Sequence, residues 1–356
     1  MRDISFLSGM GALHGLDLFN NPIADVSPLA ELDGLIWLWL GQCQITDASP
    51  FASLTNLVSL WLSGNQITNI SFLTNLTSLQ LLALDRNPLP DLEPLAGLTN
   101  LWLLDISAVT ATNLSSLTTL TRLTELSVGT LGLSDLSFLA PLTNLVRFRA
   151  NDNFVTDLPP YPHLNQLQYL NLQGNPLTRI NFVGGMTNLA DLVLNGTGIR
   201  DLSPLTGRTN LHSLALTGNG ITDLSPLATL PHLQWVSFWG NHLQDIAALG
   251  GLTNLTYADL RHNWLNINDG APAMTVIAAL QARGTAVEYV PQDVPFLPVT
   301  LADPVWLGGG KFRFTIHSTP GAVLEIWSSA DLQSWTLLGA VTNETGATSF
   351  TDTAAT

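Results

Sequence analysis

The chain has 356 residues; 46% are hydrophobic and only 11% are charged, less than half of the roughly 25% that is usual for soluble domains. So apolar a sequence excludes a disordered chain, and its longest apolar run, residues 35–40, is far shorter than the about 20 residues of a membrane span. The net charge is −15 and Lys311 is the only lysine, which argues against a nucleic acid or an anionic membrane as partner.

One short repeat organises most of the chain. Leucine recurs at a constant spacing, without insertion, through twelve units, at positions 13, 35, 57, 79, 101, 123, 145, 167, 189, 211, 233 and 255. The unit that begins at Leu57 reads LVSLWLSGNQITNISFLTNLTS, with apolar residues at places 1, 4, 6, 11, 14, 17 and 20. A single unit cannot bury a core of its own, so the units must stack.

Within each unit the pattern predicts a short strand, a turn and a tight return. Leu60 and Leu62 alternate with outward-facing neighbours, which is typical of a strand with one buried face. Because all units run the same way, adjacent strands must be parallel. The return often opens with Ser-Pro, as at residues 27–28, where serine is expected to cap a helical turn and proline to take its first position. Too few residues remain for an α-helix, so 3₁₀ turns are expected.

The ninth place of the unit is asparagine in eight of the twelve units. A buried amide there is expected to bond backbone groups of the turn and of the adjacent unit, as a structural ladder. Its members are Asn21, Asn65, Asn87, Asn153, Asn175, Asn219, Asn241 and Asn263. The exceptions are Cys43, Val109, Leu131 and Thr197. Val109 and Leu131 stand in consecutive units, so locally altered turns are expected there.

The pattern LxxLxLxxNxIxDLSPLxxLTN resembles the leucine-rich repeat of the internalin family of bacterial surface proteins, from about residue 4 to residue 268. The resemblance implies an α/β repeat: a right-handed leucine-rich repeat solenoid with a parallel concave β-sheet and short 3₁₀ or irregular convex turns. It also implies binding of another macromolecule, usually a protein. Arg208 departs from the pattern at a core place, where its stem is expected to carry the charge outward.

The chain divides into four segments: the twelve-unit solenoid at residues 1–268, a helix-strand C-terminal cap at 269–291, a linker at 292–300 and a small all-β domain at 301–356. In the cap, Asp269 is expected to begin a helix that runs to about Arg283, with Gly284 after its end, and Val287–Val290 to form a last strand.

The last domain has strand patterns at residues 312–316, 323–327, 335–341 and 347–350. Residues 329–335 resemble a hairpin motif of small C-terminal β-domains in bacterial secreted proteins. The segment 301–356 is short for a β-sandwich, which leaves open that the domain is truncated and lacks a strand.

No catalytic constellation is present, so the chain is not expected to be an enzyme or to need a cofactor. None of the seven histidines has metal-ligand spacing with acids, and Cys43 is expected to be a buried turn filler. One column repeats an acid: Asp3, Asp25, Asp47, Asp91, Asp135, Asp157, Asp201, Asp223 and Asp245. A shared calcium ion is conceivable there. A solvated acid leading into each helical turn is preferred, because Asn69 and Asn113 occupy the same column.

The third, fifth and seventh places of each unit face outward from the sheet. Five of the ten tryptophans lie there, with tyrosines and two arginines, and exposed aromatic and arginine side chains are typical of interfaces. The predicted ligand-binding residues are Trp37, Trp39, Trp61, Arg147, Arg149, Tyr169, Trp235, Trp239 and Tyr257. The alternative is that these rings only stack on each other along the sheet.

The predicted function is non-enzymatic binding of a protein partner through the concave face, at the surface or exterior of a bacterium. Glycan binding by the tryptophans is one alternative, with Asp17 and Asn171 for sugar hydroxyls. An intracellular scaffold or regulator is the other. The chain shows no signal peptide and begins inside a repeat, so we expect a fragment. We expect it to act as a monomer.

Overall fold

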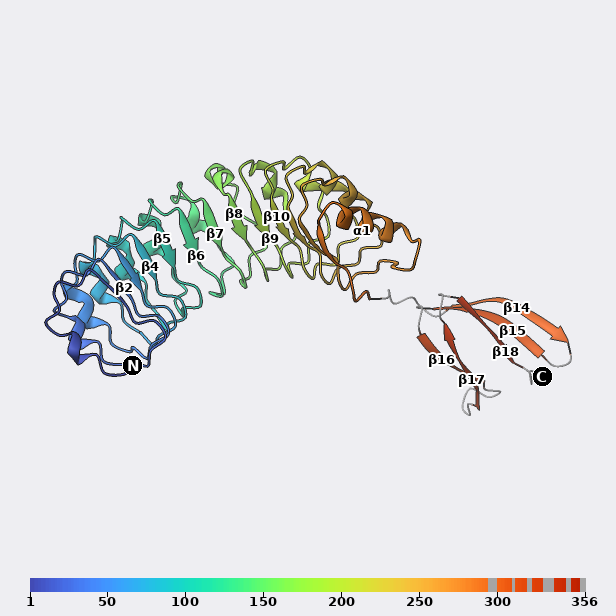
Figure 1. The fold of residues 1–356 in the computed structure, drawn as a ribbon, viewed down its shortest axis with the longest axis horizontal. Coiled ribbons are helices and arrows are strands. Elements are labelled where there is room, and N and C mark those ends of the chain that lie inside the picture. The colour runs from blue at the N-terminus through green and yellow to red at the C-terminus, as the bar shows by residue number, and fades with distance from the viewer. Residues whose placement is uncertain (294–299, 309–310, 319–321, 329–335, 344–346, 353–356) are drawn as a thin grey trace.

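A computed structural model describes the chain except for residues 294–299, 309–310, 319–321, 329–335, 344–346 and 353–356. One parallel sheet of thirteen strands, arranged in space in their sequence order, runs through the solenoid (Figure 1). The strands are β1 (Gly15–Asp17), β2 (Trp37–Trp39), β3 (Ser59–Trp61), β4 (Leu81–Ala83), β5 (Leu103–Asp105), β6 (Glu125–Ser127), β7 (Arg147–Arg149), β8 (Tyr169–Asn171), β9 (Asp191–Val193), β10 (Ser213–Ala215), β11 (Trp235–Ser237), β12 (Tyr257–Asp259) and β13 (Ala286–Glu288). The predicted leucine-rich repeat solenoid is confirmed.

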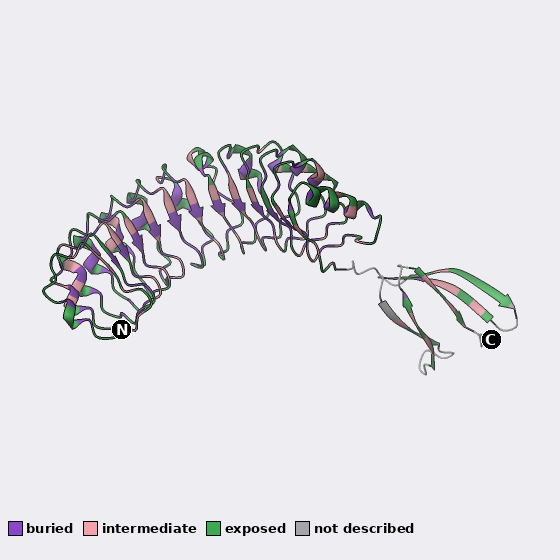
Figure 2. Cartoon of the chain, in the orientation of Figure 1, coloured by how far each residue is buried: buried purple, intermediate pink, exposed green. Residues whose placement is uncertain are grey.

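The repeat builds one continuous core. Leu60 and Leu62 are completely buried, whereas Trp61 between them is exposed. The alternation in the sequence therefore corresponds to the buried and the exposed face of β3. With the apolar residues of the return path, these leucines belong to a core that extends from Ile4 to Leu280. Figure 2 shows the buried residues as a purple band along the whole solenoid.

The return path of each unit is a 3₁₀ turn, as predicted. The twelve turns are Ser5–Leu7, Ser27–Leu29, Ser49–Ser53, Ser71–Asn75, Glu93–Gly97, Ser115–Thr119, Ser137–Leu139, Pro162–Gln166, Asn181–Gly185, Ser203–Leu205, Ser225–Thr229 and Ala247–Gly251. The predicted serine cap is wrong. Ser27 is the first residue of its turn rather than the cap, and the capping residue Val26 makes no side-chain hydrogen bond.

The aspartate column supplies the acceptor for the free backbone N–H at the start of the turn. Oδ1 of Asp25 accepts the N–H of Ser27 at 2.9 Å, and donation by the hydroxyl and N–H of Ser27 lowers the pKa of Asp25. Asn69 accepts the N–H of Ser71 in the same way at 2.8 Å, so the bond needs an oxygen and not a charge. These contacts favour the turn role over a shared calcium ion. Among the described residues, no group of three His, Cys, Asp or Glu is placed to hold a metal.

From Asn65 onward the asparagine ladder ties its units to the ones before them, whereas Asn21 is only half-buried and donates to Leu18 and Phe19 of its own unit. Nδ2 of Asn65 donates to the carbonyl oxygens of Leu40 and Leu62 at 2.8 and 2.9 Å, and its Oδ1 accepts the N–H of Ile45 at 3.1 Å. One amide therefore satisfies backbone groups of two units at once, in a place that water does not reach.

The ladder ends on Gln292, a residue that the sequence placed in the linker. Because β13 pairs with β12, Gln292 stands at the ninth place of a thirteenth unit. Its Nε2 donates to the carbonyl of Leu260 at 2.9 Å, and its Oε1 accepts the N–H of Leu265 at 3.1 Å. The next residue, Asp293, donates its N–H to the carbonyl of Asn263 at 2.7 Å. The backbone bonding of the solenoid thus continues past the predicted start of the linker.

Helix α1 (Pro272–Ala282) covers the end of the repeat. Its Ile277 and Leu280 are completely buried, and Gly284 ends it, as predicted, with φ +90°. The predicted cap at Asp269 is wrong, since Ala271 precedes the helix and proline takes its first position. No helix in the described part of the chain is long and apolar enough to cross a bilayer.

The last strands form two small antiparallel sheets, β14-β15-β18 and β16-β17. Their bounds are β14 (Thr300–Gly308), β15 (Lys311–His317), β16 (Ala322–Ser328), β17 (Thr336–Asn343) and β18 (Ala347–Asp352). The sequence missed β14, whose pattern Asp303-Pro304 interrupts, and the register of β14 with β15 shifts at that point. The predicted hairpin motif at residues 329–335, including Trp335, and residues 294–299 of the predicted linker lie outside the described residues.

Candidate functional site

The concave face of the sheet presents three rows of side chains. Up to β12 the register follows the repeat without a shift, so the fifth place of each unit lies beside the fifth place of the next, as Asp17, Trp39 and Trp61 do. The third and seventh places form parallel rows on either side. Residues far apart in the sequence therefore share one surface, and every predicted ligand-binding residue lies on it.

Three tryptophans gather at the N-terminal end of this face. The ring centroids of Trp37 and Trp39 lie 5.1 Å apart, and those of Trp39 and Trp61 lie 5.7 Å apart, all tilted. Nε1 of Trp39 donates to the hydroxyl of Ser59 at 3.3 Å. Each indole nevertheless keeps 38–40% of its surface exposed. Contact between the rings, the predicted alternative, therefore exists and still leaves the cluster open to a ligand.

The centre of the face carries charge. Nε of Arg147 and Nη1 of Arg149 lie 3.6 and 3.9 Å from Oε2 of Glu125. The guanidinium carbons of both arginines lie 4.6 Å from the ring centroid of Tyr169. Half-buried cation–π contacts of this kind hold long side chains in one place. The two predicted arginines and the predicted tyrosine thus form one charged unit with Glu125, an acid that the repeat pattern did not predict for the site.

A second aromatic cluster lies at the C-terminal end. Trp235 and Tyr257, on adjacent strands, stack at 5.6 Å with an interplanar angle of 11°. Trp239 contacts the ring of His262 at 4.9 Å, and Nδ1 of His262 lies 3.0 Å from Oδ1 of Asp293. Of the three predicted rings, Trp235 and Tyr257 contact each other, whereas Trp239 contacts His262 instead.

Arg261 forms ion pairs with two acids beside the second cluster. It pairs with Asp259 at 2.8 Å and with Glu288 at 2.9 Å. Hydrogen bonding to the nearly buried Asp259 raises the pKa of Arg261, and burial raises the pKa of Tyr257. Arg261 stands at the seventh place of its unit, so the rule that found the tryptophans could also have found it.

A hollow opens on the flank of the solenoid where the ladder fails. In the described residues, the tenth-place N–H groups of Thr110 and Gly132 make no bond to the preceding unit, whereas the equivalent N–H of Gln66 donates to the carbonyl of Ile45 at 2.9 Å. Among the described residues the same bond is also absent at Gly220, beside Asn219, so the altered turns expected for Val109 and Leu131 stay a prediction.

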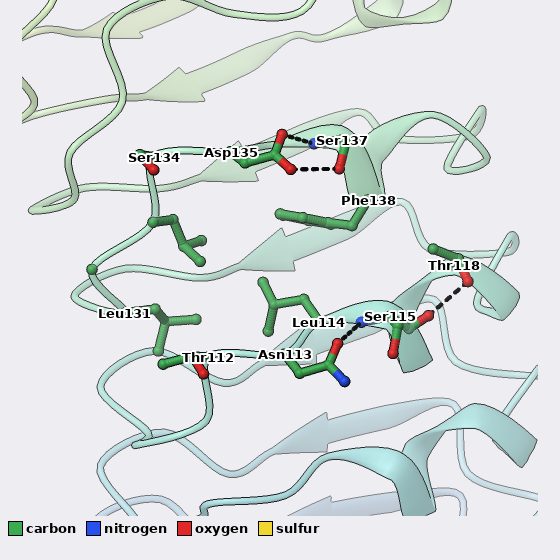
Figure 3. Close-up of a pocket in the computed structure, with 12 residues that line it drawn as sticks. Thr112, Asn113, Leu114, Ser115, Thr118, Leu131, Ser134, Asp135, Ser137 and Phe138 are labelled. Atoms are coloured by element: carbon green, nitrogen blue, oxygen red, sulfur yellow. Dashed lines mark hydrogen bonds between the residues drawn. The ribbon is translucent and has the colours of Figure 1, made fainter.

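Next to these turns lies a cavity of about 470 Å³ that is open to the surface, which Figure 3 shows with Leu131 and Phe138 toward its interior. Ser137 and Asp135 at its rim bond each other, and Asn113 bonds Ser115, so these polar groups serve the turns. We therefore place the candidate site on the concave face.

Two other residues singled out in the sequence have structural roles. Cys43 is buried, its Sγ lies 3.5 Å from the carbonyl oxygen of Leu18, and burial raises its pKa, which disfavours the reactive thiolate. Nη1 of Arg208 reaches the surface and donates to the carbonyl of Gly184 at 2.6 Å, whereas its Nε stays buried with no partner among the described residues. Both outcomes agree with the roles predicted for them.

The parallel sheet, the 3₁₀ returns and the amide ladder define a leucine-rich repeat protein. The family model "Leucine Rich repeats (2 copies)" matches residues 33–75 and 55–97. Leucine-rich repeat proteins are generally non-enzymatic scaffolds that bind protein partners. No protein of curated function matches the chain in sequence.

Within this class the chain belongs to the internalin family. An internalin (inlF) from Listeria monocytogenes is 30% identical, with a TM-score of 0.68 over 79% of this chain and 83% of that one. Internalin C2 of the same species is 34% identical, with a TM-score of 0.50 over 52% of this chain and 82% of that one. A leucine-rich repeat protein of Leptospira interrogans shares the fold at 21% identity, with a TM-score of 0.64 over 84% and 89% of the two chains.

Proposed function

We propose that this protein binds a protein partner through the concave face, at the surface or exterior of a bacterium. The observation that carries the proposal is the pair of aromatic clusters, whose tryptophans remain about 40% exposed although each contacts another ring. Large rings that a repeat core does not need are costly to leave in water unless a partner covers them. The proposed location rests on membership of a family known from bacterial surface proteins.

A protein partner suits the whole face better than a sugar does. Between the two aromatic clusters lies the charged unit of Arg147, Arg149, Glu125 and Tyr169, and interfaces between proteins combine such charge with aromatic anchors. The two clusters lie near opposite ends of the thirteen-stranded sheet, so a partner in contact with both must itself be a macromolecule.

Glycan binding is the second candidate because of one pairing. Asp17 lies opposite Trp39 in the register of β1 and β2, which places a carboxylate beside an exposed indole. A sugar ring could stack on the indole and offer its hydroxyls to the acid. This candidate concerns the N-terminal cluster alone.

Binding measurements on paired arrays of extracellular protein domains and of glycans test the proposal. We expect protein ligands, and we expect Trp39→Ala with Trp235→Ala to weaken their binding at least tenfold. Trp102→Ala is the matched control, since Trp102 precedes β5 and lies off the three outward rows. Equal binding by the double variant would show that the site is elsewhere, and glycan ligands lost with Trp39→Ala alone would favour the second candidate.

A further inference from the structure

One return path of the solenoid departs from the repeat. Eleven of the twelve 3₁₀ turns begin at the fifteenth place of their unit, as Ser203–Leu205 does, whereas the turn Pro162–Gln166 begins three residues later. The segment before this turn reads DLPPYP, where two other units have DLSPL. Because a residue that precedes proline avoids the helical region, Pro159, Pro160 and Pro162 keep the segment extended and delay the turn.

The delayed turn leaves one place of the core without its leucine. The last residue of DLSPL is buried in a regular unit, as Leu205 is, whereas Tyr161 at the same place is only half-buried. A cavity of about 600 Å³ lies beside it. The lining combines the buried core residues Leu164 and Met186 with the half-buried rings of Tyr161 and Phe182. Cavities of about 300–1,000 Å³ with such an apolar lining are typical of small-molecule sites.

The aspartate column changes its charge at this cavity. Arg179 stands in that column and is its only base. Nε of Arg179 donates to Oδ2 of Asp157 at 2.9 Å, and both residues line the cavity. Asp157 is available for this pair because Pro159, two residues on, has no N–H for the usual bond of the column. Oδ1 of Asp157 accepts the N–H of Leu158 instead, at 2.9 Å.

Arg179 has donors left over for a ligand. Among the described residues, Nη1 and Nη2 of Arg179 have no hydrogen-bond partner, and neither has the side-chain amide of Asn181 at the same cavity. Arg261 shows how this chain uses such a group, since its Nη2 pairs with Asp259 and its Nη1 with Glu288. Arg179 can hold a second carboxylate in the same way while it keeps its bond to the first.

We infer that this cavity binds a small aromatic carboxylate. The ring of the ligand lies among Tyr161, Phe182 and the thioether of Met186, because aromatic rings and sulfur make favourable contacts with a ring. Its carboxylate accepts hydrogen bonds from Nη1 and Nη2 of Arg179. The residues of this site belong to the return paths and not to the strands. The site is therefore separate from the concave face and does not depend on the function proposed for that face.

NMR of the methionine methyl groups tests the inference. The chain has four methionines, and of these Met186 lines the cavity, so ¹³C-methyl labelling gives few signals and Met186→Leu assigns the relevant one. We expect 3-phenylpropionate to shift the Met186 signal. Its affinity should be higher, by about fivefold or more, than that of 3-phenylpropanamide, which lacks the charge, and that of hexanoate, which lacks the ring.

Two arginine variants locate the charge that the ligand needs. Arg179→Gln should weaken the binding of 3-phenylpropionate about tenfold and leave that of 3-phenylpropanamide unchanged, because only the carboxylate uses the guanidinium. Arg200→Gln is the matched control. It changes the net charge equally at an exposed place of the next unit, so it should leave the binding of both compounds unchanged.

A return to the regular repeat should close the cavity. Pro159→Ser with Tyr161→Leu gives residues 157–161 the sequence of residues 201–205, so the turn can begin at the fifteenth place and a leucine can enter the core. We expect this variant to unfold at the same urea concentration as the parent chain or at a higher one. We expect 3-phenylpropionate no longer to shift its Met186 signal.

Three results would each overturn the inference: a Met186 signal that 3-phenylpropionate does not move, equal affinity for 3-phenylpropionate and either comparison compound, or equal effects of the two arginine variants. Undiminished binding by the folded variant Pro159→Ser with Tyr161→Leu would place the ligand outside this cavity and overturn it too. None of these results bears on the proposed function, which is tested by protein ligands and the tryptophan variants of the concave face.

Discussion

The indole of Trp37 lies directly over Gly15 of the neighbouring strand: a Cβ at Gly15 would stand 1.8 Å from Cε2 of Trp37. Gly41 has a similar relation to the ring of Phe19, at 3.0 Å. Aromatic rings that cover strand glycines restore the packing that a missing side chain removes. The position of Trp37 in the N-terminal cluster therefore depends on a neighbour, Gly15, that has no side chain.

Gly15→Ala should displace the Trp37 ring, because the new methyl group cannot share its place. We expect the ¹⁹F signal of Trp37 in protein labelled with 5-fluorotryptophan to shift and broaden, with Trp37→Phe to assign it. Ser213→Ala, at the same place of β10, should leave that signal where it was. An unchanged Trp37 signal in Gly15→Ala would mean that the ring does not lie on the glycine in solution.

Asn241→Ala should destabilise the solenoid more than any exposed asparagine does. Nδ2 of Asn241 donates to the carbonyls of Leu216 and Phe238, both at 2.9 Å, and its Oδ1 accepts the N–H groups of Ile221 and Asn219. The variant leaves these buried groups without partners, at a cost of about 2–4 kcal/mol. Urea unfolding followed by circular dichroism measures the loss.

Asn56→Ala is the control for that experiment. Asn56 is exposed and donates one bond, to the carbonyl of Asp33 at 2.8 Å, so its loss should cost well under about 1 kcal/mol. Similar losses for Asn241→Ala and Asn56→Ala would contradict the role given to the ladder.

The aspartate column should make the stability of the folded chain depend on pH. Hydrogen bonds from Ser27 and Ser203 lower the pKa of Asp25 and Asp201 in the folded chain below the unfolded value of about 3.9. A depressed folded pKa contributes stability that is fully present above the unfolded pKa and is lost as the pH falls through the folded pKa. The thermal midpoint should therefore fall from about pH 4 downward.

Asparagine in place of these two aspartates should make the stability of the fold depend less on pH and should leave the turns intact. Asn69 shows that an amide oxygen accepts the same N–H, so Asp25→Asn with Asp201→Asn should preserve the fold at neutral pH. The midpoint of this variant should vary less between pH 5 and pH 2.5, a window set about the unfolded value of about 3.9. Identical pH profiles for the variant and the parent chain would refute the capping role.

Tyr169→Ala should loosen the central arginines. The ring lies 4.6 Å from both guanidinium carbons, and each such contact at a partly exposed site is worth about 0.5–1 kcal/mol. We expect a combined loss of about 1–2 kcal/mol in urea unfolding, whereas Tyr169→Phe, which keeps the ring, should stay close to the parent. If the two variants behave alike, the ring does not hold Arg147 and Arg149.

The repeat made most of the fold predictable. A constant spacing held through twelve units places every strand of the repeat, and the alternation around Leu60 and Leu62 identifies the buried face. The predictions that were wrong concern single residues at element ends. Ser27 and Asp269 suit a helix start by residue type, but the backbone placed another residue at each cap. Local preference is weak against the constraints of the adjacent unit.

The places beyond the repeat were harder to predict. Gln292 takes the place of a ladder asparagine because β13 returns to the sheet after helix α1. Since that helix lies between β12 and β13, Gln292 does not follow the regular spacing of the repeat. Strand β14 contains Asp303-Pro304, a pair that predicts a break in an isolated segment. In both cases pairing with a neighbouring strand decided the outcome, and one sequence does not show which strands will pair.

The sequence by itself determined the solenoid, its core columns and the set of outward-facing rows, because a strict period leaves each side chain only one face to occupy. The tertiary structure decided which of those side chains meet. It placed Trp37 on Gly15 and set two arginines over Tyr169. Periodicity gives the row of a residue, whereas ring orientation and the space between side chains depend on packing across strands, which no single repeat contains.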